Sequence, residues 1–91
     1  MYAWIITKDE TETPGTPASS VNVCGPSGDA WNHWNKDQVR AKGVTFKMYD
    51  DDHELYYTGK IVGDYAGFEP LDEFGMAYAG CTGIKYNGEY L

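Results

Sequence analysis

VTFKMYDDDHELYYTGKIV, residues Val44–Val62, contains two runs of β-branched and aromatic residues around an acidic centre. Such side chains pack well on a half-buried pleated surface, and the polar centre is typical of a chain reversal, so the stretch predicts a β-hairpin. Side chains alternate between the two faces of a strand, which assigns one set of residues to the core. The residues expected to face inward are Val44, Phe46, Met48, Leu55, Tyr57 and Ile61.

Three further stretches predict strands. Tyr2–Thr7 is apolar on both faces, which is typical of a strand inside a sheet. Val21–Cys24 predicts a short strand, and Cys81–Tyr86 alternates into a final one. An Asn-Gly pair at 87–88 favours a tight turn, because both residues tolerate positive φ. Residues 89–91 are expected to be a short end without structure.

The main helix is predicted within residues 29–42 and has two candidate starts. Ser27 or Asp29 is a suitable N-cap, and a glycine at position 43 suits the C-terminal end. A start at Asn35 is the alternative, because a glutamine three residues later completes a capping box. In that case the two tryptophans before Asn35 lie in the preceding loop.

The 91 residues are too few for two hydrophobic cores and predict a single domain, 1–91. Residues 8–20 contain two prolines and no hydrophobic period, which predicts a mobile loop. Residues 69–75 predict one helical turn, held to the core by Leu71 and Phe74. The expected fold class is α+β: an antiparallel β-sheet of four to five strands with one main α-helix packed on one face.

Fourteen acidic residues against seven basic ones give a formal net charge of −7. A field of that sign repels nucleic-acid phosphates and anionic membrane surfaces, so no direct binding to either is expected. It attracts basic surfaces, including those of proteins that hold nucleic acid. A charge of this size also serves solubility alone, and that alternative stays open.

No stretch approaches the ~20 apolar residues of a membrane span, and the opening MYAWIITKDE lacks the pattern of a signal peptide. The expected location is the cytoplasm, where Cys24 and Cys81 are expected to be reduced. The sequence has no nucleophile elbow, phosphate-binding loop, dinucleotide fingerprint or zinc-ligand spacing. Neither enzymatic activity nor a cofactor is therefore expected.

The centre of the hairpin, Asp50–Glu54, supplies four carboxylates and one imidazole, which are ligands for hard cations. It lacks the glycine and the spacing of an EF-hand loop, and aspartates are frequent in turns because they bond their own backbone. An acidic turn without a metal is therefore predicted. The alternative is a metal or small-molecule site around the loop of Cys81, or around Asp50, Asp52, His53 and Glu54.

Eight tyrosines and three tryptophans outnumber three phenylalanines. Tyrosine and tryptophan combine apolar area with a polar tip and are enriched at protein interfaces. Tyr56 and Tyr57 are neighbours on one predicted strand, so one of them is exposed unless both faces are covered. A small core that uses every aromatic side chain is the competing explanation. The residues predicted to bind a protein partner are acidic groups for steering and aromatic anchors: Asp50, Asp51, Asp52, Glu54, Asp72, Glu73, Tyr56, Trp31 and Trp34.

Three phrases carry a family resemblance: WIITKD (Trp4–Asp9), FKMYDDDHELYYTGK (Phe46–Lys60) and FEPLDEFGMAYAGCTGIKY (Phe68–Tyr86). They are similar to a group of uncharacterised small acidic proteins of actinobacteria, phages and other mobile elements, in whose pattern a glycine stands at the position of His53. The resemblance implies a cytosolic single domain. A looser likeness, based on size and charge, is to phage anti-defence proteins such as anti-CRISPR and antirestriction proteins, many of which occupy a nucleic-acid site on their target.

These features predict a non-enzymatic protein whose acidic, aromatic-bearing surface occupies a basic site on another protein. Inhibition of a nucleic-acid-handling complex is the specific form of this hypothesis. A small-molecule or divalent-metal-binding module is the alternative, and an accessory domain without an inhibitory role is the third.

Overall fold

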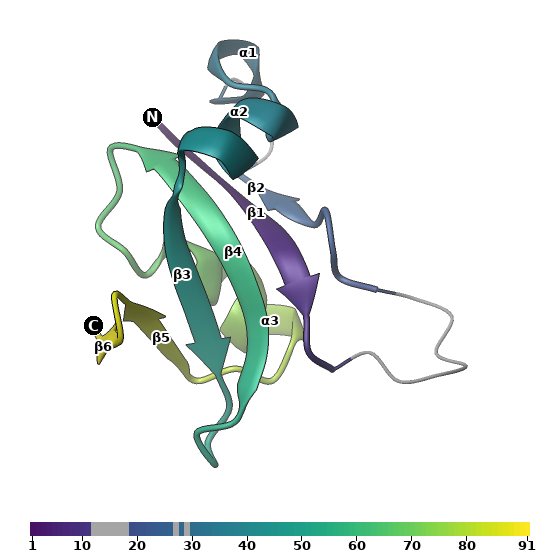
Figure 1. Ribbon diagram of the computed structural model, residues 1–91, viewed down its shortest axis with the longest axis vertical. Helices are drawn as coiled ribbons and strands as arrows, with labels where there is room; N and C mark the ends of the chain where they lie inside the picture. The colour runs from purple at the N-terminus through teal and green to yellow at the C-terminus, as the bar shows by residue number, and fades with distance from the viewer. Residues whose placement is uncertain (12–18, 27, 29) are drawn as a thin grey trace.

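The computed structural model describes residues 1–11, 19–26, 28 and 30–91 (Figure 1). Of the loop predicted for residues 8–20, the part from 12 to 18 lies outside the described residues, as do the candidate caps Ser27 and Asp29. The first two residues of that predicted loop instead continue the first strand to Asp9.

The described chain forms one antiparallel sheet of six strands in the order β2-β1-β4-β3-β5-β6. The α+β class is confirmed, but the expectation of four to five strands was wrong. Residues 89–91 were expected to be unstructured, yet Asn87 and Gly88 both have positive φ and turn the chain back, so that Tyr90 pairs with Lys85. The strands are β1 (Tyr2–Asp9), β2 (Cys24–Gly25), β3 (Val44–Tyr49), β4 (Leu55–Gly63), β5 (Gly83–Tyr86) and β6 (Glu89–Tyr90).

The hairpin predicted from Val44–Val62 is confirmed as β3 and β4. Phe46 and Met48 are fully buried, as their alternation predicts. Val44 was expected to face inward but is 49 % exposed, because it is the first residue of β3 and lies at an edge of the covered area. The pairing shifts between Met48 and Tyr49, which leaves Tyr56 without a direct partner across the hairpin.

Short helices cover both faces of the sheet, which corrects the expectation of one main helix on one face. The start at Asn35 is confirmed, since α2 (Lys36–Lys42) carries a complete capping box between Asn35 and Gln38. A separate turn, α1 (Ala30–His33), precedes it. The helical turn predicted at 69–75 is also found, as η1 (Leu71–Gly75), a wide π-helical turn that continues into α3 (Met76–Tyr78).

The hydrophobic core consists of two clusters on opposite faces of the sheet. Trp4 and Ile6 of β1 belong to the larger cluster, against which Leu71 and Phe74 of η1 pack. Ala3 and Ile5, the alternate residues, belong to a smaller cluster closed by Val39 of α2. In Figure 1, α1 and α2 gather at the end of the sheet where β3 begins, and α3 lies behind the sheet. Among the described residues, the helices on the side that bears α2 therefore cover one end of the sheet.

Candidate functional site: an acidic hairpin end beside a lysine–tyrosine face

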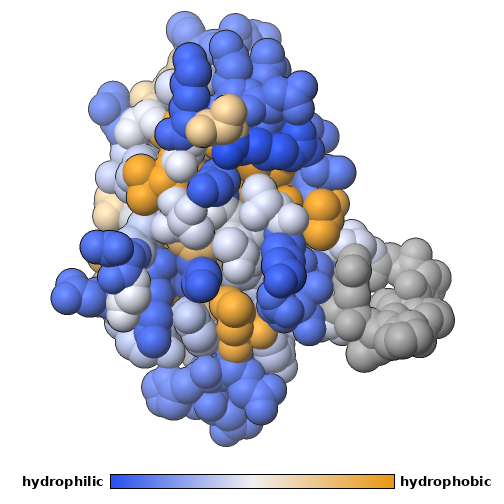
Figure 2. Space-filling view, viewed as in Figure 1, coloured by the Kyte–Doolittle hydropathy of each residue, from blue (hydrophilic) through white to orange (hydrophobic). Residues whose placement is uncertain are grey.

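The turn between β3 and β4 bears Asp50, Asp51, Asp52 and Glu54, together called here the acidic hairpin end. One carboxylate oxygen of Asp50 accepts hydrogen bonds from the backbone N–H groups of Asp52, at 2.9 Å, and Glu54, at 2.8 Å. The backbone N–H of Asp50 donates to the carbonyl of Glu54 at 3.0 Å. Asp50 thus holds the turn, while Asp51, Asp52 and Glu54 are exposed (Figure 2, hydrophilic lower end).

Asp50 also connects the turn to Tyr56. The hydrogen bond from the Glu54 backbone is the main reason why the pKa of Asp50 lies below its ordinary value. Tyr56 in turn has a raised pKa, first because its hydroxyl bonds to Asp50 and then because of that residue's charge. Its half-buried ring stands edge-on to the ring of Tyr57, with 6.1 Å between ring centres. The structure therefore brings one predicted aromatic anchor to the predicted acidic groups.

His53 adopts the left-handed conformation in the same turn, with a φ of 63°. This conformation favours glycine, so His53 occupies a position at which glycine is the less strained residue. Its ring nitrogen Nδ1 lies 2.9 Å from the hydroxyl of Tyr90. That contact links the acidic hairpin end to the face of the sheet beside it.

Trp31 and Trp34 lie elsewhere. Both are half-buried and pack against the smaller core cluster at the end of the sheet where β3 begins, whereas the acidic hairpin end follows the last residue of β3. The indole N–H of Trp31 donates to the carbonyl of Pro26 at 2.6 Å. The two rings thus pack the α1 segment against the sheet.

Asp72 and Glu73 form a third location, on η1 across the sheet from the tryptophans. Asp72 is exposed. The carboxylate of Glu73 is half-buried and accepts hydrogen bonds from the indole N–H of Trp4, at 2.9 Å, and from the hydroxyl of Tyr2. The nine residues predicted to bind a partner are thus divided among three places in the fold.

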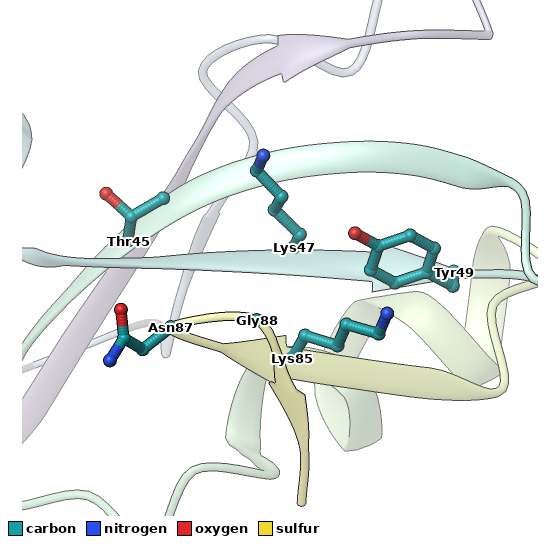
Figure 3. A pocket seen from close by; sticks show the side chains of 6 residues that line it. All are labelled: Thr45, Lys47, Tyr49, Lys85, Asn87 and Gly88. Atoms are coloured by element: carbon teal, nitrogen blue, oxygen red, sulfur yellow. The ribbon is translucent and has the colours of Figure 1, made fainter.

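The part of the sheet beyond α1 and α2 carries a group of residues that was not predicted as a site, called here the lysine–tyrosine face. Figure 3 shows four of its members: Thr45, Lys47, Tyr49 and Lys85. Residues directly opposite each other in an antiparallel pair share a face, and Lys47 pairs with Lys85 while Lys85 pairs with Tyr90. Among the described residues, no carboxylate lies within salt-bridge distance of these lysines. The face consists of Thr45, Lys47, Tyr49, Lys60, Lys85 and Tyr90.

A shallow cavity of about 270 Å³ opens on this face, lined by Thr45, Lys47, Tyr49, Lys85 and the turn at Asn87. The ammonium group of Lys85 lies 4.7 Å from the ring centre of Tyr49 and 4.5 Å from that of Tyr90, in cation–π geometry. Because side chains alternate along a strand, Lys47 was expected to point away from the core that Phe46 and Met48 face. The pairing of β3 with β5, which brings Lys47 beside Lys85, could not be predicted from the sequence.

The described residues contain no group of three or more His, Cys, Asp or Glu side chains placed to hold a metal ion. Both thiols are free: Cys24 is half-buried, and Cys81 is buried, which raises its pKa to about 12. A thiol with so high a pKa is a poor nucleophile near neutral pH. The charged groups that the structure does bring together are carboxylates at the hairpin end and ammonium groups with tyrosine rings beside it.

No protein-family model, curated protein or solved structure matches the chain. The resemblance carried by Phe46–Lys60 and Phe68–Tyr86 therefore stays a prediction. None of the helices described is long and apolar enough to cross a membrane.

Proposed function

We propose that this chain is a non-enzymatic protein-binding module whose acidic hairpin end occupies a basic surface of a partner protein, as an inhibitor of a nucleic-acid-handling complex would. The observation that carries the proposal is the turn held by Asp50, which orders the backbone that bears three exposed carboxylates. Because this turn is already ordered, less conformational entropy is lost on binding than if the acidic groups stood on a mobile loop.

The charge of the whole chain supports the same function. A net charge of −7 attracts a basic partner over a distance of about 10 Å at 0.1 M salt and raises the association rate. Tyr56, next to Asp50, is the anchor that fits this surface, since interface energy concentrates on buried aromatic side chains. Asp51, Asp52 and Glu54 then act in steering and orientation.

The test starts with affinity capture of the tagged chain's partner from bacterial lysate at low and at high salt, followed by measurement of the association rate with the purified partner. The double variant Asp51→Lys/Asp52→Lys is expected to lower the association rate at least tenfold at low salt and to flatten its salt dependence. Asp37→Lys/Asp64→Lys is the matched control. It makes the same change in charge at two exposed carboxylates outside the hairpin end.

An equal decrease of the association rate in both double variants would mean that the rate depends only on net charge. That result would contradict a binding site at the hairpin end. An association rate unchanged by the Asp51→Lys/Asp52→Lys variant would contradict its electrostatic basis. A fold check by circular dichroism separates either result from unfolding.

The lysine–tyrosine face supports a second candidate function, the binding of a small anionic molecule. Its cavity of about 270 Å³ is slightly below the roughly 300 Å³ at which ligand pockets usually begin, which suits only a small molecule. Its lysines are free of carboxylate partners among the described residues. A thermal-shift panel of inorganic phosphate and nucleoside monophosphates tests this, because a ligand that binds only the folded state raises the melting temperature. A rise that disappears in Lys47→Ala/Lys85→Ala but persists in Lys36→Ala/Lys42→Ala, on α2, would favour this function over the first.

A further inference from the structure

A pocket of about 310 Å³ lies between β2 and the η1–α3 segment, on the covered side of the sheet. Its lining residues include Phe74, Tyr78, Glu73 and Trp4. Trp4 is only 2 % exposed, so Phe74 and Tyr78 offer most of the aromatic surface. The ring centres of Trp4 and Phe74 are 6.1 Å apart, with an angle of 37° between their planes. Tyr78 stands at the rim and is 83 % exposed, the most exposed large apolar side chain described.

The carboxylate of Glu73 is held in this pocket by two neutral donors, the indole N–H of Trp4 and the hydroxyl of Tyr2. Burial and then the hydrogen bond to Glu73 raise the pKa of Tyr2, so the tyrosine stays a donor across the physiological range. In the part of the chain that the structure describes, no lysine or arginine lies within 4.0 Å of Glu73. Glu73 is therefore a half-buried, oriented anion without a cation.

The shape and charge of this pocket select one kind of occupant. An apolar side chain would strip water from the Glu73 carboxylate without replacing its hydrogen bonds, which is unfavourable. A guanidinium group is planar, weakly hydrated, stacks on aromatic rings and donates paired hydrogen bonds to a carboxylate. A lysine ammonium is more strongly hydrated and lacks the flat surface for stacking.

We infer that the pocket of Trp4, Glu73, Phe74 and Tyr78 binds an arginine side chain from a basic segment of a partner protein. The inference rests on the proposed function, since it names the chemistry of the same basic partner at a second contact. It uses other residues than the acidic hairpin end, which makes the two separable. Glu73 supplies the charge, and Tyr78 closes over the guanidinium from the rim.

The probe for this site is acetyl-Gly-Arg-Gly-amide, titrated to millimolar concentration while the indole N–H resonance of Trp4 is followed by NMR. A saturable shift of that resonance is expected with the arginine peptide. The same peptide with lysine is expected to bind at least fivefold more weakly, and that with norleucine should give no saturable shift. Full saturation by the norleucine peptide at the same concentration would identify an apolar groove and overturn the assignment.

Two pocket variants and one control variant test whether the shift of the Trp4 resonance comes from binding in the pocket. Glu73→Gln keeps the shape of the side chain but removes its charge, and is expected to weaken binding of the arginine peptide at least fivefold. Tyr78→Ala is expected to weaken it at least threefold; because Tyr78 is so exposed, this variant keeps the test valid if Glu73→Gln does not fold. Glu89→Gln, on β6 at the opposite edge of the sheet from β2, makes the same chemical change and should bind unchanged.

Binding that is unaffected by both pocket variants would overturn the inference. Its failure also differs from failure of the proposed function. A captured partner whose affinity depends on Asp51 and Asp52 but not on Glu73 and Tyr78 would leave the hairpin proposal intact and remove this one. If the arginine peptide binds the pocket but no partner's affinity depends on Asp51 and Asp52, the pocket inference stands and the hairpin proposal is contradicted.

Discussion

The two faces of the sheet are covered to different extents, although the same strands supply both. On one face, Trp4, Phe46 and Met48 lie under the η1–α3 segment and are at most 2 % exposed. On the other face, α1 and α2 cover only the end near Ile5 and Val39, and polar side chains occupy the rest. The covered face carries the main core, whereas the half-covered face leaves room for a polar surface.

The contrast shows how a chain of this size creates binding surfaces. The helices of the described residues close one face of the six-stranded sheet and part of the other. Where the cover ends, alternation along the strands puts lysines and tyrosines into solvent, and the hairpin extends its acidic end beyond the sheet. The acidic residues of the hairpin end are neighbours in the sequence, whereas the lysines are brought together by the pairing of β3 with β5.

The difference between the two faces is expected to be largest at adjacent residues of β3. Phe46→Ala is expected to lower the free energy of unfolding by about 4 kcal/mol, because it leaves a cavity in a fully buried site. Lys47→Ala, one residue later and exposed on the other face, is expected to change it by less than about 0.5 kcal/mol. Urea unfolding followed by circular dichroism measures both. Similar losses for the two variants would mean that the polar face is part of the core.

The partial cover on the second face predicts a smaller effect at the start of α2. Asn35→Ala removes the 2.8 Å hydrogen bond that the Asn35 side chain accepts from the backbone N–H of Gln38, and is expected to cost about 1 kcal/mol of unfolding free energy. The 2.9 Å bond from the backbone N–H of residue 35 to the Gln38 side chain can still form. Asn32→Ala, exposed in α1, is the matched control and is expected to be nearly neutral. If Asn35→Ala cost as much as Phe46→Ala, the α1–α2 cover would be as important to stability as the main core.

Acid titration gives the smallest expected effect and concerns the end of the sheet that bears the hairpin turn. Burial pushes the pKa of Asp9 upward, but hydrogen bonds from Thr11 and Ser20 outweigh it, so the pKa lies below its ordinary value. The pKa of Asp50 also lies below its ordinary value, mainly because of the hydrogen bond from the Glu54 backbone. A pKa that is lower in the folded than in the unfolded state means that the unfolded state binds more protons in acid. The stabilisation is then present above about pH 4 and lost as the pH falls through the folded-state values.

Unfolding free energies measured between pH 7 and pH 2.5 test this expectation. The wild-type chain should lose stability below about pH 4, and Asp9→Asn should show a shallower loss. Asp51→Asn, a carboxylate that accepts none of the hydrogen bonds found among the described residues, should follow the wild type. A steeper acid loss in Asp9→Asn than in the wild type would contradict the sign of the shift.

Features whose cause lies within a few residues could be predicted from the order of the amino acids. The hairpin at Val44–Val62 follows from β-branched and aromatic alternation, and the capping box at Asn35 follows from one side chain three residues away. The helical turn of Leu71 and Phe74 and the tight turn at Asn87 were predicted for the same reason. Local propensity suffices where the interacting groups are neighbours in the chain.

Contacts between residues far apart in the chain could not be predicted in this way. Trp4 and Glu73 are 69 residues apart, yet they share a hydrogen bond and a pocket. Lys47 and Lys85 meet because β3 pairs with β5, and no periodicity in the sequence specifies a pairing between distant strands. Trp31 and Trp34 were grouped with the acidic residues by composition, but packing placed them on the core. Long-range pairing and packing select these neighbours, because burial depends on the whole assembled sheet.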